Sequence, residues 1–472
     1  MGLVEPVPLL APSELGRLHF VAAGGAGMSP VAGCYAALGL PVSGCDQVGS
    51  ATLDKLARAG VDVHIGHDPA HVAGADTMVV SSAIRPENPE LTTARAAGRR
   101  IWHRSAALGA LMLGRAGIAV TGTHGKTTTS AMLFTALAAA GADPSAVLGA
   151  PLAATGQSCH IGTGDAFVIE ADESDGSFLQ YPAQTIVITN IEADHLDNWG
   201  TPQAYAAGFE RLARGDDVRT VVLDVDDPGA ARLAASVAGT AARLIGVGTD
   251  RAAEVRLSEL AGDGPAARAV LRIGGQEHLL RLAVPGVHNL RDAALAVAAG
   301  WAHGADPAAL LDGLASFTGA ARRFQRVGEA RGVRVVDDYA HHPTELAVVL
   351  RAARPLVGGG RLVACFQPHL FTRTRDFAPD FGVSLAGADL VVVTDVYAAR
   401  EDPIPGVTGE LVARGAAAAG ARVVYEPDLA ALPARLAGLV RDGDLVITLG
   451  AGDVTEIGPA LLRELGGGEP DA

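Results

Sequence analysis

The sequence predicts an α/β fold, because strand-like apolar runs alternate with helical stretches rich in Ala and Leu along its 472 residues. At about 150 residues per domain, this length indicates roughly three domains. We place them at residues 1–114, 115–318 and 319–472. Hydrophobic residues make up 49 % of the chain and charged residues 19 %, so large cores can be buried and a disordered protein is excluded.

Charge and cysteine content narrow the class of protein further. The net charge of −15 argues against a protein that coats nucleic acid. The four cysteines lie far apart and predict no disulfide framework. Residues 1–14 lack the basic region of a signal peptide, and no run of 18 apolar residues occurs. We therefore expect a cytoplasmic protein that does not insert into a membrane.

Each predicted unit has strands of its own. In the first unit, we expect strands at 18–22, 41–44 and 77–80, and a helix at 30–38. In the second, we expect strands at 117–121, 166–169, 185–189 and 220–223, a small antiparallel sheet within 251–277, and a buried helix at 293–300. In the third, we expect strands at 333–336, 361–366, 390–394 and 445–449.

The first glycine turn is Ala22-Ala23-Gly24-Gly25-Ala26-Gly27-Met28, between a strand and a helix. Asp46 ends the next strand, as in a dinucleotide-binding fingerprint, but the glycine spacing is imperfect. A site for a pyrophosphate or a nucleotide diphosphate fits equally well. A tight turn that serves only close packing is the alternative.

The second glycine turn is Gly122-Thr123-His124-Gly125-Lys126-Thr127-Thr128, again between a strand and a helix. It is typical of a phosphate loop, with backbone N–H groups around the phosphate, Lys126 on the β and γ oxygens and Thr127 on Mg²⁺. Val120 stands where the longer form of this loop has Gly, so the loop is the short G-x-x-G-K-T form. Lys126 is one of two lysines in an arginine-rich chain, the other being Lys55. An ordinary capped turn is the alternative.

Two acidic runs follow strands of the second unit. Glu170-Ala171-Asp172-Glu173-Ser174-Asp175 comes after the strand 166–169, at a strand end where open α/β sheets bind ligands. Glu170 suits a hard cation, and a solvated acidic turn is the alternative. Asn190-Ile191-Glu192-Ala193-Asp194-His195-Leu196-Asp197 repeats the pattern. Its His195 is a candidate metal ligand or a helix cap.

Polar runs also follow strands of the third unit. Asp337-Asp338-Tyr339-Ala340-His341-His342-Pro343 precedes a helix, so capping is the alternative for its histidines. Phe366-Gln367-Pro368-His369 and Thr372-Arg373-Thr374-Arg375-Asp376 follow a later strand. Arg373 and Arg375 suit a carboxylate or a phosphate, and a surface ion-pair cluster is the alternative.

Taken together, these motifs make the chain resemble the Mur ligases of peptidoglycan synthesis, above all the branch that adds alanine. The matches span nearly the whole chain in the family's order. They are Gly24–Met28, Thr121–Thr129, Glu170–Asp175, Thr189–Asp197, Pro285–Ala293, Arg322–Phe324, Asp337–Glu345, Phe366–Asp376 and Pro403–Gly406.

The resemblance implies three domains: an N-terminal Rossmann-like domain for a UDP-sugar, a central P-loop ATPase domain with a mixed sheet, and a C-terminal Rossmann-like domain for an amino acid. It implies ATP and Mg²⁺ as cofactors, and UDP-N-acetylmuramate and L-alanine as substrates. The lactyl carboxylate is expected to attack the γ-phosphate, and the alanine amine is expected to attack the resulting acyl phosphate. We expect a monomer or a weak homodimer, without a nucleic-acid partner.

The resemblance also implies roles for individual residues. The metal ligands are Thr127, Glu170 and His195. The ATP contacts are Gly122, Thr123, His124, Gly125, Lys126, Thr127, Thr128, His288, Asn289, Asp337 and Tyr339. The UDP-sugar contacts are Gly24, Gly25, Gly27, Asp46, Ser81 and Ser82. The amino-acid pocket contains His341, His369 and Arg373, with Arg375 as a further candidate. The catalytic set is Lys126, Glu170, His195, His341 and Arg373.

Three features locate the chain within the family. Sister ligases hold a metal with a carbamylated lysine, but no lysine follows Lys126, and His195 stands where the alanine-adding branch has a histidine. Ala22 replaces a usual Gly, which predicts an altered first turn. Leu370 replaces a frequent Arg, so Arg373 or Arg375 is expected to bind the carboxylate of alanine.

Three other functions remain open. The first is a recycling ligase of the same family that attaches a tripeptide. The second is a regulatory P-loop ATPase, which would hydrolyse ATP without a UDP-sugar. The third is a nucleotide-sugar oxidoreductase, which would bind NAD(P) tightly.

Overall fold

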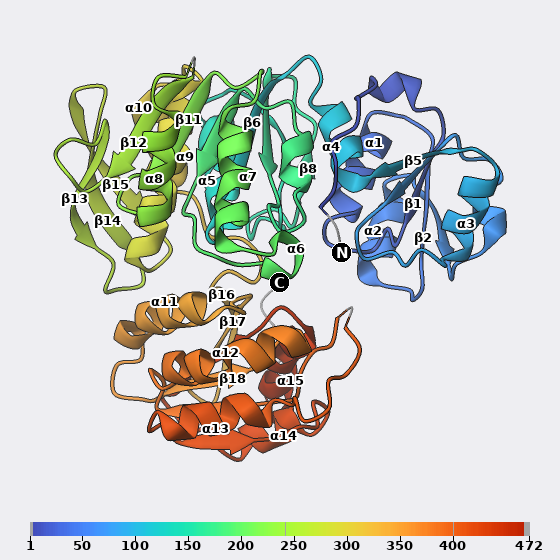
Figure 1. The fold of residues 1–472 in the computed structure, drawn as a ribbon. Coiled ribbons are helices and arrows are strands. Elements are labelled where there is room, and N and C mark those ends of the chain that lie inside the picture. The colour runs from blue at the N-terminus through green and yellow to red at the C-terminus, as the bar shows by residue number, and fades with distance from the viewer. Residues whose placement is uncertain (1–2, 241, 400, 467–472) are drawn as a thin grey trace. The chain divides into compact units, whose positions relative to one another are not determined.

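The computed structural model describes residues 3–240, 242–399 and 401–466, which form three sheets flanked by helices (Figure 1). The described residues make two compact units. The first contains most of the chain up to Phe317, and the second contains the chain from Thr318 together with Leu260–Arg268 and Leu282–Leu290. Within the described ranges, no helix combines the length and the apolar character that crossing a lipid bilayer requires.

The first sheet is parallel, with the strand order β3-β2-β1-β4-β5. Its strands are β1 (Leu18–Val21), β2 (Val42–Asp46), β3 (Asp62–Ile65), β4 (Thr77–Val80) and β5 (Arg100–His103). Its helices are η1 (Pro12–Glu14), α1 (Ser29–Ala37), α2 (Ala51–Arg58), η2 (Pro69–Val72), α3 (Pro89–Ala96) and α4 (Arg104–Leu111). The strand order reverses beside β1, so the first glycine turn lies at the switch point where such sheets bind ligands.

The second sheet has ten strands, in the order β15-β14-β13-β12-β11-β10-β6-β9-β7-β8. Its strands are β6 (Ala116–Thr121), β7 (Ser145–Val147), β8 (Cys159–His160), β9 (Ala166–Glu170), β10 (Thr185–Ile188), β11 (Thr220–Asp224), β12 (Arg243–Gly248), β13 (Val255–Ala261), β14 (Ala267–Ile273) and β15 (Gln276–Leu282). The sheet is mixed, because β8 pairs antiparallel with β7 while β6, β9, β10 and β11 are parallel.

Helices connect these strands and bury their apolar sides. They are α5 (Lys126–Ala139), η3 (Ser177–Gln180), α6 (Leu196–Trp199), α7 (Pro202–Ala213), α8 (Pro228–Val237), α9 (Val287–Ala302) and α10 (Pro307–Leu314). The central strands β6, β9 and β10 are almost continuously apolar and buried, as expected for parallel strands covered on both faces.

The third sheet has the order β16-β17-β21-β18-β19-β20, with β16 antiparallel at one edge. Its strands are β16 (Gln325–Ala330), β17 (Val333–Asp338), β18 (Leu362–Phe366), β19 (Leu390–Val393), β20 (Val423–Tyr425) and β21 (Leu445–Leu449). Its helices are α11 (Pro343–Ala353), η4 (Arg354–Leu356), α12 (Phe371–Leu385), α13 (Glu410–Ala418), α14 (Leu432–Ala437), η5 (Asp453–Glu456) and α15 (Ile457–Glu464).

The predicted fold class is confirmed, and most predicted strands shift by one or two residues at their ends. One expectation needs correction. Residues 251–277 do hold neighbouring strands, β13, β14 and the start of β15, as expected, but these belong to the ten-stranded central sheet, because β13 pairs parallel with β12 through Val247–Val255 and Gly248–Arg256. The helix expected at 293–300 is longer, running from Val287 to Ala302. The domain boundaries at 114/115 and 318/319 stay predictions.

Ala22 follows β1 directly and has a left-handed conformation, with φ of 58°. Its carbonyl accepts a hydrogen bond from Gly25 N–H at 3.1 Å, which closes the turn before α1. A left-handed L-residue costs roughly 1–2 kcal/mol, whereas Gly adopts this region readily. The turn therefore keeps a backbone shape that suits Gly although the residue is Ala.

We expect Ala22→Gly to leave the free energy of unfolding unchanged or to raise it by up to about 1 kcal/mol, since the relief of left-handed strain offsets the greater chain entropy of Gly. The control Ala206→Gly, at an exposed position inside α7, should lose about 1 kcal/mol. Urea unfolding of both variants measures the difference. Equal losses in the two variants would contradict the strain at Ala22.

Candidate active site

The phosphate loop between β6 and α5 depends on two glycines with positive φ. Gly122 has φ of 130° and Gly125 has φ of 85°. A Cβ atom at Gly122 would lie 2.1 Å from Thr189 Oγ1, and one at Gly125 would lie 2.7 Å from Asp292 Oδ1. No larger residue fits either position without displacing these neighbours, so the loop keeps its backbone close to the strand ends.

Lys126 begins α5 and turns back over its own loop. Its Nζ donates to Gly122 O at 2.6 Å and to Thr123 O at 3.0 Å, and it lies 2.9 Å from Glu173 Oε2. Burial acts to lower the pKa of Lys126, but the nearby carboxylates, Glu173 first, outweigh it and raise that pKa. The ammonium group therefore stays charged in a site with only 16 % of its side chain exposed.

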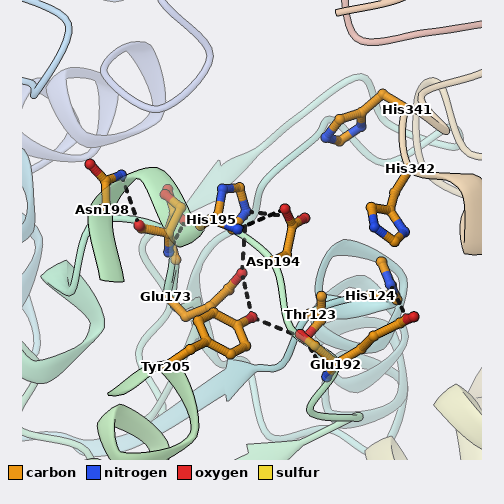
Figure 2. Close-up of polar contacts among 12 residues, drawn as sticks. Thr123, His124, Glu173, Glu192, Asp194, His195, Asn198, Tyr205, His341 and His342 are labelled. Atoms are coloured by element: carbon orange, nitrogen blue, oxygen red, sulfur yellow. Dashed lines mark hydrogen bonds and ion pairs between the residues drawn. The ribbon is translucent and has the colours of Figure 1, made fainter. Parts of the chain in front are cut away.

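Glu173 was not singled out from the sequence, although it lies in the acidic run after β9. Its side chain is fully buried, and its Oε1 lies 3.4 Å from Tyr205 Oη and 3.7 Å from His195 Nε2 (Figure 2). Tyr205 Oη is also 2.9 Å from Thr123 Oγ1. Glu173 thus links the phosphate loop to α7 and to His195. Only its contacts in the folded chain distinguish it from the other acids of the run.

His195 itself has a left-handed backbone, with φ of 53°, and precedes α6. Its Nε2 lies 3.6 Å from Asp194 Oδ2 as well as near Glu173. A ring among carboxylates suits a ligand of a cation that they share. The run after β10 also supports the loop, because the Asn190 side chain accepts from His124 N–H at 2.9 Å.

Glu170 ends β9 with one carboxylate oxygen held out of water. Its Oε2 is buried and has no hydrogen-bond partner among the described residues. A Cβ atom at Gly149 would lie 1.9 Å from that oxygen, so the carboxylate fits here because residue 149 is a glycine. An unpaired buried carboxylate oxygen is costly, and a hard cation would satisfy it. Thr127, predicted to bind the same metal, lies buried in the first turn of α5.

A cavity of about 180 Å³ lies where the first glycine turn meets the strand ends of the central sheet. Its lining includes Gly27, Arg104, Glu170, Asp172 and Tyr181. Arg104 Nη2 lies 2.8 Å from Asp172 Oδ2. A Cβ atom at Gly27 would lie 1.8 Å from Arg104 Nη1, so the glycine leaves room for the guanidinium group. The cavity thus combines a fixed cation with an acidic group that could hold a metal.

The predicted UDP-sugar residues lie at the strand ends of the first sheet. Gly24 N–H donates to Asp46 Oδ2 at 3.0 Å, while Gly25 and Gly27 complete the turn. Ser81 follows β4, and the neighbouring Ser82 Oγ donates to Asp175 Oδ2 at 2.5 Å and lies 3.2 Å from His103 Nε2. Burial lowers the pKa of His103 to about 4, so its ring is neutral at pH 7.

The second compact unit holds its own set of predicted residues. Asp337 is buried, and its carboxylate accepts from Arg322, Thr448 and Thr455. Tyr339 lies under two guanidinium groups, with Arg322 Cζ 4.9 Å and Arg323 Cζ 5.2 Å from its ring centre. Asp337 therefore anchors the end of β17, and Tyr339 presents an aromatic face beside it.

The two histidines before α11 differ in their contacts. His342 is the N-cap, and it forms a capping box with Glu345, as the capping alternative predicted. His341 precedes the cap, with its ring 5.3 Å from that of Tyr339 and 5.7 Å from that of His369. His341 and His369 therefore belong to one aromatic cluster.

The two candidate arginines of α12 differ in their exposure to solvent. Arg373 is buried, with 8 % of its surface exposed, whereas the Arg375 side chain is 53 % exposed and pairs with Asp376 at 2.7 Å. Leu370, which precedes the helix, has φ of 68° and is buried. Arg375 thus shows the surface ion pair that its alternative predicted, and Arg373 is the arginine within the packed unit.

His288 and Asn289 lie in the first turn of α9. Asn289 Nδ2 donates to Pro285 O at 2.6 Å, which ties the helix to the segment before it. Burial lowers the pKa of His288 to about 4, so at pH 7 the ring is neutral and has one donor and one acceptor nitrogen. Such a ring suits an uncharged heterocycle.

Comparison with known proteins finds one family along most of the chain. The model described as "Mur ligase family, catalytic domain" matches residues 17–116, "Mur ligase middle domain" matches 120–300, and "Mur ligase, glutamate ligase domain" matches 322–452. A curated protein of Cutibacterium acnes, named UDP-N-acetylmuramate–L-alanine ligase, is 60 % identical over 99 % of this chain and 100 % of its own length.

Two further relatives point to the same family. A protein of the same name from Kineococcus radiotolerans is 53 % identical over 96 % of this chain and 97 % of its own. The crystal structure of UDP-N-acetylmuramate–alanine ligase MurC from Thermotoga maritima has a TM-score of 0.80 at 27 % identity, covering 95 % of this chain and 98 % of that one. These matches extend over all three sheets, and the chain therefore belongs to the Mur ligase family.

Proposed function

We propose that the chain joins L-alanine to UDP-N-acetylmuramate in peptidoglycan precursor synthesis, using ATP and releasing ADP and phosphate. The observation that carries this proposal is the cavity in which Arg104, Glu170 and Asp172 lie beside the first glycine turn. The names of the relatives support the choice of substrates. The cytoplasmic location and the monomer or weak homodimer expected from the sequence stay predictions.

The proposed reaction has two bond-forming steps. A lactyl carboxylate oxygen attacks the γ-phosphorus and ADP leaves, which gives an acyl phosphate. The alanine nitrogen, as the free amine, then attacks the acyl carbon and forms a C–N bond. The C–O bond to phosphate breaks, phosphate leaves, and the nitrogen gives up one proton to solvent. The first step brings two anions together, so the site must supply positive charge and hold the reactants in line.

Lys126 is the residue that we assign to this charge. Its present contacts with two loop carbonyls and Glu173 keep the ammonium group at the mouth of the loop. Backbone N–H groups at the start of α5 add the favourable end of the helix dipole. Glu173 is a positioning residue in this proposal, because it acts through Lys126.

Thr127, Glu170 and His195 are the residues that we assign to Mg²⁺. The unpaired Oε2 of Glu170 supports this fit, since Mg²⁺ prefers oxygen ligands. When bound, the ion supplies Lewis-acid stabilisation of the phosphoryl oxygens. Arg104, whose guanidinium group already lies against Gly27, is suited to orient the sugar carboxylate in the same cavity.

The remaining substrate contacts are assigned by position. Gly24, Gly25, Gly27, Asp46, Ser81 and Ser82 are proposed for the UDP-sugar. Gly122, Thr123, His124, Gly125, Thr128, His288, Asn289, Asp337 and Tyr339 are proposed for ATP. In the amino-acid pocket we favour Arg373 over Arg375, because Arg373 is buried whereas the Arg375 side chain is 53 % exposed. His341 and His369 complete that pocket.

A phosphate-release assay tests the function directly. With ATP and magnesium present, we expect phosphate only when both UDP-N-acetylmuramate and L-alanine are added, because the acyl phosphate needs one and its breakdown needs the other. The assay compares L-alanine with the tripeptide L-Ala-γ-D-Glu-diaminopimelate. Release with the tripeptide but not with alanine would favour the recycling ligase. Release without the UDP-sugar would favour the regulatory ATPase.

Lys126→Ala should lower the rate of amide formation at least about a hundredfold, since it removes the charge assigned to the γ-phosphate. Binding of UDP-N-acetylmuramate, measured by calorimetry, should be unchanged. Lys55→Ala is a matched control, because Lys55 is an exposed lysine on α2. In Lys126→Ala the buried carboxylate of Glu173 loses its charged partner. The double variant Lys126→Ala/Glu173→Gln removes that buried charge as well, so it should fold but stay inactive. Activity like that of the wild type in this folded double variant would refute the role of Lys126.

Glu170→Gln should raise the magnesium concentration for half-maximal activity about tenfold or more, because an amide binds the ion less tightly than a carboxylate. Glu210→Gln, on the surface of α7 where Glu210 pairs with Arg214, is the control and should leave that concentration unchanged. Magnesium titrations of the phosphate-release rate measure both. The same magnesium requirement in wild type and Glu170→Gln would remove Glu170 from the metal site.

A further inference from the structure

A group of metal-binding side chains, three of them buried and two half-buried, lies in the first sheet, apart from the cavity described above. Its members are one cysteine, one glutamate and several histidines. They are His19 on β1, Cys45 on β2, His67 after β3, His71 in η2 and Glu90 in α3. None of these residues has a role in the proposed ligase reaction.

Strand alternation brings the group together. On β1, Leu18 and Phe20 belong to the large hydrophobic core, whereas Val21 packs in a smaller core with Cys45. His19 alternates with the first pair, so it faces the side of the sheet covered by α3. Val21 and Cys45 lie opposite each other in the parallel register, which places Cys45 on that same side.

Glu90 is the centre of the group and is fully buried. Its Oε2 accepts from Cys45 Sγ at 2.9 Å and lies 3.7 Å from His19 Nε2, while its Oε1 lies 2.7 Å from His71 Nδ1. The ligand atoms of His19, Cys45, His71 and Glu90 all lie within 4.8 Å of one another. Four donors of three chemical types therefore lie close enough together to bind one ion.

His19 adds an independent observation. Its side chain is fully buried, and its Nε2 has no hydrogen-bond partner among the described residues. Its other ring nitrogen, Nδ1, lies 2.9 Å from Ser43 Oγ, which fixes the orientation of the ring. Histidine ligands of metals have this arrangement, with one nitrogen held by an outer partner and the other directed at the ion.

We propose that His19, Cys45, His71 and Glu90 bind one Zn²⁺ ion as a closed structural site. Imidazole, thiolate and carboxylate donors in a set of four suit Zn²⁺, whereas Mg²⁺ and Ca²⁺ prefer oxygen alone. Bonds of about 2.1 Å in a tetrahedron put ligand atoms about 3.4 Å apart. One oxygen of Glu90 would bind the ion, so the short contact of that oxygen, from Oε2 to Cys45 Sγ or from Oε1 to His71 Nδ1, must open by several tenths of an ångström when the ion enters.

Binding exchanges a proton for the metal. The Cys45 S–H bond breaks, its proton passes to solvent, and a bond from sulfur to zinc forms without a change in oxidation state. His67 Nδ1, 3.3 Å from Cys45 Sγ, is placed to donate a hydrogen bond to the thiolate. The ion would hold β1, β2, η2 and α3 together. Its ligand Cys45 directly precedes Asp46, whose side chain accepts a hydrogen bond from the first glycine turn.

The test uses the full-length protein, stripped with a chelator and then equilibrated with zinc chloride. After desalting, elemental analysis should find about one zinc per wild-type chain. Cobalt(II) in place of zinc should give tetrahedral d–d bands and a thiolate-to-cobalt charge-transfer band. A wild-type chain that retains no zinc, or that shows no thiolate band, would overturn the proposal, and the group would then be a hydrogen-bonded carboxylate only.

Variants locate the ion. Cys45→Ser should lose the charge-transfer band and bind zinc at least about tenfold more weakly. Cys365→Ser is the matched control, because Cys365 is also a buried strand cysteine but lies in β18 of the third sheet. It should keep the band and the stoichiometry. Unchanged zinc binding in Cys45→Ser would place the ion elsewhere and overturn the proposal. If Cys45→Ser does not fold, the wild-type cobalt spectrum decides.

Discussion

A buried ammonium group organises the nucleotide side of this protein. Lys126 bonds to two carbonyls of its own loop and to Glu173. The indole Nε1–H of Trp199 donates to the Glu173 backbone carbonyl, and the Tyr205 hydroxyl donates to the Glu173 carboxylate, which keeps Glu173 in place. Taking either charge out of water alone would cost several kcal/mol, so each group requires the other. The positions of β6, β9 and α5 are coupled through this pair, and the phosphate loop takes its shape from it.

The same electrostatic balance extends into the cavity beside the loop. Glu170 and Asp172 bring negative charge to the end of β9, and Arg104, at the start of α4, forms an ion pair with Asp172. The Oε2 of Glu170 is left without a hydrogen-bond partner in the described chain. A protein with a net charge of −15 that handles phosphates and carboxylates must concentrate its few cations where reactants meet. Here the cations are one lysine, one arginine and, in our proposal, magnesium.

Local sequence patterns were sufficient to predict the fold class and the phosphate loop. The strand–glycine–helix order at 117–139 predicts a phosphate loop from local rules alone, and β6, α5 and the two left-handed glycines match it. The acidic run after β9 was recognised as a unit, but which acid meets Lys126 was not. Adjacent carboxylates look alike in sequence, and only the path of the chain after β9 buries Glu173 and leaves Glu170 beside Gly149.

The sequence by itself determined the α/β class, the three sets of strands, the two glycine turns and the family, because these depend on periodicity and on motifs only a few residues long. The tertiary structure decided which distant residues meet. Arg104 reaches Asp172, His341 packs with His369, and the group around Glu90 assembles from four separate elements. Each of these contacts joins residues through strand register and side-chain direction, which exist only once the sheets have formed.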